Sequence, residues 1–191
     1  MRNYLLLFPL LFLLFSCSES LDLKFNGSDI TEARLNPSFK LTSHLGKVTK
    51  LEDFSGKVLA IFFGFTHCPD VCPTTMYELK AIKESLGGDG DKLQVIFVSL
   101  DPERDSIELL EKFIPSFDSS FIGLTGSATD IKKIAGQYKI YYQKVGSDKN
   151  YTIDHSSAIY LIDKNGSIRI RHPYGSSQEM IVNDIKSLLS I

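Results

Sequence analysis

The chain has 191 residues, of which 43% are hydrophobic, so it is long and apolar enough to bury the core of one globular domain. Its formal net charge is -2 and it contains no long basic run, so neither nucleic acid nor an acidic surface is indicated as a partner. Trp is absent, and no repeat or low-complexity tract is visible.

The first residues have the pattern of an export signal. Arg2 precedes an apolar run over residues 4–15, which is too short to cross a bilayer because a spanning helix needs about 20 residues. The run ends at residues 14–17, whose sequence resembles the lipobox of bacterial lipoproteins. We therefore expect a lipoprotein signal peptide over residues 1–16 and a lipid on Cys17. Cleavage of the signal nearby, which would leave Cys17 as a free thiol, is the alternative.

Residues 17–33 are expected to form the anchor cysteine and a tether, because residues 18–33 are polar and lack periodicity. The folded domain would then occupy residues 34–191. Export places this domain in the bacterial cell envelope, lipid-anchored and facing the periplasm or the extracellular side. Disulfides persist there, so a thiol pair that binds metal would need a reductant to stay reduced.

The predicted domain opens with a β-hairpin and a buried strand. Residues 39–41 and 48–51 flank a turn over residues 44–47, in which His44 is expected to be solvated. The run over residues 58–63 is apolar without alternation, which is typical of a central strand covered on both faces.

Helical and strand patterns alternate after this strand. A helix ends at Gly87-Gly88 and carries apolar residues at helical spacing: Met76, Leu79, Ile82 and Leu86. A second buried strand follows over residues 93–100, and the order strand, helix, strand implies a parallel pair. The next patterns are a helix over residues 107–114, a strand over 121–124, a helix marked by Ile131, Ile134 and Tyr138, and an extended segment over 139–145.

The end of the chain predicts a hairpin and a closing helix. Residues 158–162 and 168–172 flank Asn165-Gly166, and this dipeptide is a strong hairpin signal. An amphipathic helix is lined by Ile181, Ile185, Leu188 and Leu189. Together, these elements predict an α/β domain: a mixed sheet with helices on both faces and an N-terminal β-hairpin, an arrangement that matches a thioredoxin-like fold.

Two cysteines four positions apart, Cys68 and Cys72, follow the first buried strand. Pro73 favours the first helical position, so we expect Cys72 at a helix entrance and Cys68 in the loop before it. Free backbone N–H groups and the positive end of the helix dipole favour a thiolate there, at an edge where open α/β sheets bind ligands. An inert disulfide needs none of this placement. We therefore expect chemistry from the pair, either redox exchange or capture of a soft metal.

A metal held by two sulfurs alone would need a third ligand, and four histidines are available. His67 adjoins the cysteines but is free to point away from them, and His172 carries no other signal. His155 lies in the loop that enters the strand over residues 158–162. In thioredoxin-like folds this loop faces the cysteine loop, so the expected fold, and not the spacing along the chain, selects His155.

Three stretches of the chain resemble the Sco/SenC family of copper-binding, thioredoxin-like proteins that assist cytochrome c oxidase assembly. They occur in the family's order at residues 63–73, 98–105 and 154–157, and the resemblance covers about residues 35–190. The resemblance implies that Cys68, Cys72 and His155 are ligands of copper, as Cu(I) and in principle also as Cu(II). Asp101 matches an acidic position of the family near the site, and a helix cap or a surface ion pair is the alternative for it.

The resemblance implies a metallochaperone that delivers copper to the binuclear copper site of cytochrome c oxidase. Its partners would be the copper-bearing subunit of the oxidase, a copper donor, a thiol reductant and, through Cys17, the membrane. The alternative is an enzyme, a thiol–disulfide reductase in which Cys68 and Cys72 are the catalytic, redox-active pair and His155 has no required role. A peroxidase of the same fold class would explain the second cysteine and the histidine poorly.

Overall fold

The computed structural model describes residues 24–147 and 150–191. The expected signal peptide over residues 1–16 and the expected lipid on Cys17 lie outside the described residues. Within the two described ranges, no helix combines the length and the apolar character that a membrane span requires.

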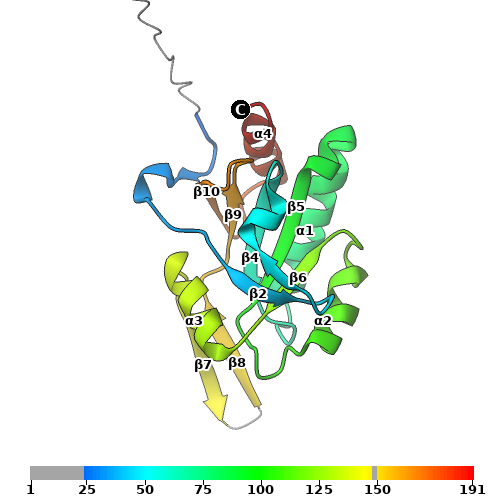
Figure 1. The fold of residues 1–191 in the computed structure, drawn as a ribbon, viewed down its shortest axis with the longest axis vertical. Coiled ribbons are helices and arrows are strands. Elements are labelled where there is room, and N and C mark those ends of the chain that lie inside the picture. Colours follow the sequence, from blue (N-terminus) through cyan, green and yellow to red (C-terminus); the bar gives the residue numbers. More distant parts are fainter. Residues whose placement is uncertain (1–23, 148–149) are drawn as a thin grey trace, which may run out of the picture.

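The centre of the described domain is an eight-stranded mixed sheet (Figure 1). In spatial order its strands are β1 (Ser28–Asp29), β10 (Ile168–Pro173), β9 (Ala158–Ile162), β4 (Val58–Gly64), β5 (Leu93–Ser99), β6 (Ile122–Thr125), β2 (Lys40–Ser43) and β3 (Val48–Lys50). The strands β4, β5 and β6 run parallel. The pairs β2–β3 and β9–β10 are antiparallel. The predicted parallel pair and both predicted hairpins are therefore confirmed.

In the described part of the chain, four α-helices cover the two faces of this sheet: α1 (Val71–Ser85), α2 (Ile107–Phe113), α3 (Ala128–Gln137) and α4 (Gln178–Leu189). Short 3-10 helices complete it: η1 (Thr31–Ala33), η2 (Leu51–Phe54), η3 (Gly87–Lys92) and η4 (Ile114–Ser116). Helices α1, α2 and α4 pack in one hydrophobic core, and α3 packs in the other. Because every residue of β4 and β5 is buried, their alternating side chains enter both cores. The expected thioredoxin-like α/β fold is confirmed.

Three of the helices begin directly after a serine. The hydroxyl groups of Ser106, Ser127 and Ser177 accept hydrogen bonds from backbone N–H groups in the first turns of α2, α3 and α4. Each serine thereby satisfies a donor that has no partner inside the helix. These local signals explain why the helices begin where they do.

A third hairpin lies outside the eight-stranded sheet. Strands β7 (Tyr142–Ser147) and β8 (Asn150–His155) pair only with each other, as a separate two-stranded sheet. Figure 1 shows this hairpin in yellow, extending from the lower end of the domain. The predicted extended segment over residues 139–145 overlaps its first strand, whereas the second strand was not predicted. The alternation of Tyr151, Ile153 and His155 with polar residues was the signal that could have revealed it.

Residues that we expected in the tether belong to the folded domain. Strand β1 pairs antiparallel with β10. The backbone N–H groups of Asn26 and Gly27 donate to the carboxylate of Asp184 on α4, at 2.8 Å and 2.9 Å. The same carboxylate lies 2.9 Å from Nε2 of His172, and both of these side chains are completely buried. The domain thus starts before residue 34, because a buried acceptor on α4 fastens the preceding segment.

His44 is buried, so the expectation that it is solvated is wrong. Only 4% of its surface is exposed. Its ring Nδ1 accepts a hydrogen bond from the backbone N–H of Gly123 at 3.1 Å, and the backbone N–H of His44 donates to the Gly123 carbonyl at 2.8 Å. The side chain is covered because β2 joins the edge of β6, a pairing that the local sequence of the turn does not reveal.

Candidate functional site

The two cysteines lie between β4 and α1. Cys68 is in the connecting loop and is partly exposed, whereas Cys72 is completely buried; both thiols are free. Helix α1 begins at Val71, so Cys72 is its second residue. We predicted Pro73 as the first helical residue, whereas it is the third. The structure confirms that Cys72 lies at the helix entrance and that Cys68 lies in the loop before it.

The two thiols have opposite electrostatic environments. A hydrogen bond from the Cys72 thiol, together with backbone N–H groups of Asp70 and Cys72, lowers the pKa of Cys68 to about 5. The Cys72 N–H lies 3.4 Å from the Cys68 sulfur. The pKa of Cys72 is raised, because its thiol proton is held by Cys68 and because burial disfavours its charged form. At neutral pH, Cys68 is thus the thiolate and Cys72 remains protonated.

His155 faces this pair from the end of β8. Its Nε2 lies 3.8 Å from the sulfur of Cys72. Its Nδ1 lies 3.1 Å from the carbonyl oxygen of Ser156, and because a carbonyl only accepts, Nδ1 carries the ring hydrogen. The lone pair of Nε2 is thereby directed toward Cys72. We predicted His155 in a loop, whereas it is the last residue of a strand.

Aromatic rings hold the imidazole from two sides. The ring centroids of Phe62 and Phe65 lie 6.4 Å and 6.0 Å from that of His155, both with edge-on geometry. Phe62 belongs to β4, and Phe65 begins the cysteine loop. The imidazole is consequently packed against the same strand and loop that carry the thiols.

Gly64 provides the space for the buried sulfur. A Cβ at this position would lie 2.8 Å from the sulfur of Cys72 and 2.9 Å from the Phe97 ring. Such separations are shorter than real contacts allow, so only glycine lets the last residue of β4 approach the thiol so closely. Gly64 lies within the stretch over residues 63–73 that resembles the family, but no local pattern predicts its role beside the thiol.

A buried carboxylate fastens the start of the cysteine loop. Asp105 is completely buried, and it accepts hydrogen bonds from the N–H of Thr66 at 3.1 Å, from the Thr66 hydroxyl at 2.6 Å and from the Ser99 hydroxyl at 2.6 Å. Burial raises the pKa of Asp105. We did not predict a role for Asp105, although it lies within the stretch over residues 98–105 that resembles the family.

The other residues considered from the sequence are Asp101 and His67. Asp101 is completely buried and pairs with Arg104, so it is neither a helix cap nor a surface pair. The side chain of His67 is 50% exposed, and its Nδ1 lies 3.0 Å from the Thr66 hydroxyl. Among the hydrogen bonds of the described residues, His155 is the histidine that contacts a thiol.

The donor atoms suit a soft metal ion, although they are not yet closed around one. Across residues 24–147 and 150–191, no three His, Cys, Asp or Glu side chains are already grouped around a common metal position. The separation of 3.8 Å between Cys72 Sγ and His155 Nε2 is nevertheless suitable for two ligands of one ion. Metal–sulfur and metal–nitrogen bonds of about 2.3 Å and 2.0 Å, at a trigonal angle, span about 3.7 Å. The Cys68 thiolate would complete a set of two sulfurs and one nitrogen.

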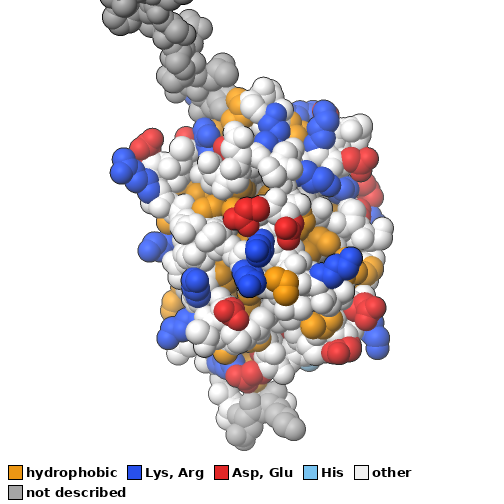
Figure 2. Space-filling model, in the orientation of Figure 1, with side chains coloured by type: hydrophobic (Ala, Val, Ile, Leu, Met, Phe, Trp, Pro, Cys, Tyr) orange, Lys and Arg blue, Asp and Glu red, His pale blue; other side chains and the backbone are white. Residues whose placement is uncertain are grey.

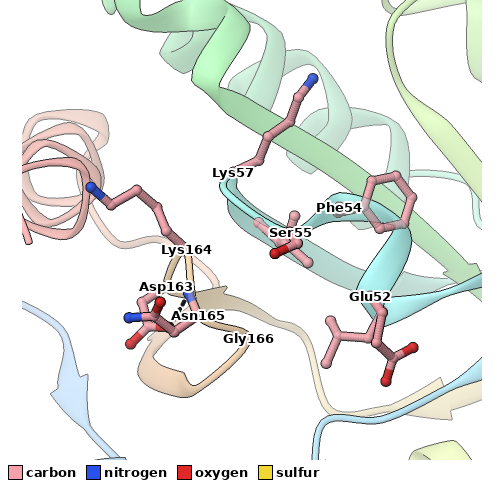
Figure 3. A pocket seen from close by; sticks show the side chains of 10 residues that line it. Glu52, Phe54, Ser55, Lys57, Asp163, Lys164, Asn165 and Gly166 are labelled. Atoms are coloured by element: carbon pink, nitrogen blue, oxygen red, sulfur yellow. Dashed lines mark hydrogen bonds between the residues drawn. The ribbon is translucent and has the colours of Figure 1, made fainter.

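A separate pocket lies near the start of β4, at the other end of that strand from the cysteines (Figure 3). It has a volume of about 170 Å³ and lies between η2 and the β9–β10 turn. Its lining includes Lys57, which precedes β4, whereas the cysteines follow the end of β4. The face of the molecule in Figure 2 shows acidic and basic side chains interspersed, without a large patch of one sign. Neither feature adds a donor atom to the thiol and imidazole site.

A thioredoxin-like domain with a thiolate, a buried thiol and a facing imidazole defines a class of thiol proteins suited to soft metals and to disulfide exchange. The model of the SCO1/SenC family matches residues 27–190, and the chain belongs to this family. The predicted family membership is therefore confirmed.

Known relatives agree with this assignment. An SCO2-like protein of Rickettsia prowazekii is 39% identical over 136 residues, which are 70% of this chain and 66% of the relative. The structure of Bradyrhizobium japonicum ScoI with copper bound is 38% identical, with a TM-score of 0.74, and the match covers 81% of this chain and 99% of that one. A SCO1/SenC family lipoprotein from Bacillus anthracis is 30% identical, with a TM-score of 0.70, over 79% of this chain and 92% of its own.

Proposed function

We propose that this protein binds copper through Cys68, Cys72 and His155 and delivers it to the binuclear copper site of cytochrome c oxidase. The observation that carries the proposal is the approach of His155 Nε2 to the Cys72 sulfur at 3.8 Å, with the lone pair directed by the Nδ1 hydrogen bond. Two sulfurs and an imidazole suit Cu(I), and they also suit Cu(II). Membership of the SCO1/SenC family, and a copper-bound relative of 38% identity, support the same function.

The states of the two thiols predict how copper would be taken up. Cys68 is already a thiolate at neutral pH, so it offers the first sulfur without losing a proton. Cys72 is protonated and has to release one proton as it becomes a ligand. Cu(I) with two thiolates and a neutral imidazole has a net charge of about -1, which a half-exposed loop tolerates. Stepwise exchange of sulfur ligands with the recipient would then release the ion without freeing it into water.

Copper loading of the reduced domain tests the proposal. We expect one Cu(I) per chain, with two sulfur neighbours and one nitrogen neighbour in the X-ray absorption spectrum. His155→Ala should lose the nitrogen neighbour, and Cys72→Ser should lose one sulfur. His67→Ala is the matched control, because this half-exposed histidine adjoins Cys68 yet should change neither count. The proposal fails if His155→Ala keeps the wild-type nitrogen neighbour and affinity.

A second function, thiol–disulfide reduction, is favoured by the pKa of Cys68, lowered to about 5, beside a buried and protonated Cys72. The Cys68 thiolate would attack a partner disulfide, form a mixed disulfide and expel one partner thiolate. Cys72 would lose its proton and attack the Cys68 sulfur, which releases the second partner thiolate and leaves the Cys68–Cys72 disulfide. The partner gains two electrons, and an external thiol reductant has to restore the pair.

One variant separates the two functions. If His155→Ala abolishes copper binding but leaves reduction of a disulfide substrate intact, the imidazole serves copper alone. Both activities could serve one recipient, since its cysteines have to be reduced before they accept copper. Copper delivery requires three partners: the oxidase subunit that bears copper, a copper donor and a thiol reductant.

We also propose that the domain is held in the bacterial cell envelope by a lipid on Cys17. The lipobox-like sequence supports this, as does the Bacillus anthracis relative that is a lipoprotein. Mass spectrometry of the mature N-terminus tests it. A lipidated Cys17 as the first residue is expected, and an unmodified N-terminus would rule out the anchor.

A further inference from the structure

Within the described residues, the hairpin that carries His155 forms no strand ladder with the central sheet, because β7 and β8 pair only with each other there. Strand pairing with the sheet therefore does not set the position of the imidazole relative to the thiols. Side-chain contacts have to do so. The polar ones come from one short stretch after β5, residues 101–105, which we call the bridge segment.

Arg104 of the bridge segment is bound to Tyr151 of β8. Its Nη1–H donates to the Tyr151 carbonyl at 2.8 Å, and its Cζ lies 3.6 Å from the centroid of the Tyr151 ring. Asp101 closes the group, because it accepts hydrogen bonds from Arg104 Nε and, at 2.6 Å, from the Tyr151 hydroxyl. The side chain of Asp101 is completely buried and that of Arg104 is 18% exposed. Water consequently screens these charge-assisted contacts little.

The same bridge segment is bound to the cysteine loop. Its last residue, Asp105, accepts the two hydrogen bonds from Thr66 at 3.1 Å and 2.6 Å. Arg104 Cζ also lies 6.0 Å from the centroid of Phe65, the ring that contacts His155 edge-on. Five consecutive residues thus join the strand that ends at His155 to the loop that carries Cys68.

The remaining attachments of the hairpin are an exposed ion pair and apolar contacts. Lys144 of β7 pairs with Glu103 at 2.6 Å, but the two side chains are 42% and 64% exposed, so the pair contributes little. Ile153 of β8 is 4% exposed and packs in the core of α1 and α4. Tyr142 packs against the same core, and the rings of Phe62 and Phe65 meet that of His155 edge-on. Without the polar contacts of the bridge segment, a hairpin held by these apolar contacts would stay attached but could pivot. Because His155 lies two residues from Ile153, a pivot would move the imidazole away from Cys72.

We propose that Arg104 is a positioning residue that couples the two halves of the site, through its contacts with Tyr151 and with the bridge segment that holds the cysteine loop. It keeps His155 Nε2 next to the Cys72 sulfur before any metal arrives. The coupling is a property of the metal-free protein, and its consequence for copper rests on the proposed function.

The metal-free, reduced protein provides the direct test, with Arg104→Lys as the variant, because lysine keeps the charge but loses the planar fork and the ring stacking. We expect amide hydrogen exchange in β8 to become at least about tenfold faster, with α4 unchanged. The nuclear Overhauser contact between the His155 ring and the Cys72 β-protons should weaken or disappear. Tyr151→Phe, which removes only the hydroxyl, should give a smaller change in the same direction.

Arg169→Lys is the matched control. Arg169 also pairs with a buried aspartate, Asp163, at 3.2 Å, and lies 5.9 Å from the Phe25 ring, but it contacts neither half of the site. We expect wild-type exchange in β8 for this variant. Unchanged exchange and an unchanged His155–Cys72 contact in Arg104→Lys would overturn the proposal, as would an equal change in Arg169→Lys.

Copper binding supplies a second readout. Arg104→Lys should bind Cu(I) at least about tenfold more weakly and show a weaker nitrogen shell. A nitrogen shell and an affinity equal to wild type would contradict the coupling. If the wild-type protein binds copper without a nitrogen neighbour, the proposed ligand set fails, yet a loss of the His155–Cys72 contact in metal-free Arg104→Lys would still support the coupling.

Discussion

Replacement of Gly64 by alanine would place a methyl group against the buried cysteine. The new Cβ would lie 2.8 Å from the Cys72 sulfur and 2.9 Å from Cε2 of Phe97. Ordinary contacts between such atoms are about 3.5–4.0 Å, so each neighbour has to move by roughly 0.6 Å or more. Both side chains are completely buried, which leaves them no free space to enter.

We expect Gly64→Ala to lower the free energy of unfolding by about 1–3 kcal/mol, which is the usual cost of overpacking a core. For a domain of this size the melting temperature should fall by about 2–4 °C per kcal/mol. Urea and thermal unfolding of the reduced protein, followed by circular dichroism, measure both quantities. Copper affinity should fall as well, because the displaced sulfur changes the separation of 3.8 Å from His155.

Gly136→Ala in α3 is the matched control for this substitution. Nothing lies within 4 Å of a Cβ at Gly136, and alanine is a better helix former than glycine. We expect this variant to be as stable as the wild type or up to about 1 kcal/mol more stable. Wild-type stability of Gly64→Ala, or equal losses in the two variants, would refute the steric explanation.

Three further outcomes are expected. The rate of alkylation of Cys68 should follow a pKa of about 5 and fall as the pH drops through that value. Cys72→Ala should raise the pKa of Cys68, because the Cys72 thiol is the main hydrogen-bond donor to the thiolate. Slower alkylation of this variant at about pH 6 would reveal the change. Burial lowers the pKa of His44, so as the pH falls the unfolded chain takes up the proton first. The stability that this histidine contributes above about pH 6.5 is therefore lost as the pH falls through the folded-state pKa. His44→Gln should flatten the dependence of the free energy of unfolding on pH in this range, measured by urea unfolding. Asp184→Ala should destabilise the domain by about 3–5 kcal/mol, because buried His172 and two backbone N–H groups lose their acceptor, at about 1–3 kcal/mol for each unsatisfied group. An unchanged melting temperature would contradict this.

Short-range patterns in the chain are sufficient to locate the cysteine loop and its scaffold. The apolar run over residues 58–63, the helical spacing that follows Cys72, and the Asn-Gly turn each depend on neighbours a few positions apart. Local backbone preferences and burial periodicity are sufficient to indicate such elements. The sheet apart from β1, its helices and the thiol pair were therefore predictable, and so was the family resemblance carried by three short stretches.

Tertiary structure decides everything that joins distant segments. The burial of His44 and of His172 arises where β2 meets β6 and where α4 meets the N-terminal segment, and no local pattern indicates either contact. The thiolate is assigned to Cys68 only by hydrogen bonds that α1 directs at it. The approach of His155 to Cys72 depends on a hairpin fastened by side chains and not by a strand ladder. Residue identity along the chain can name the donor atoms, but only packing sets the distances between them.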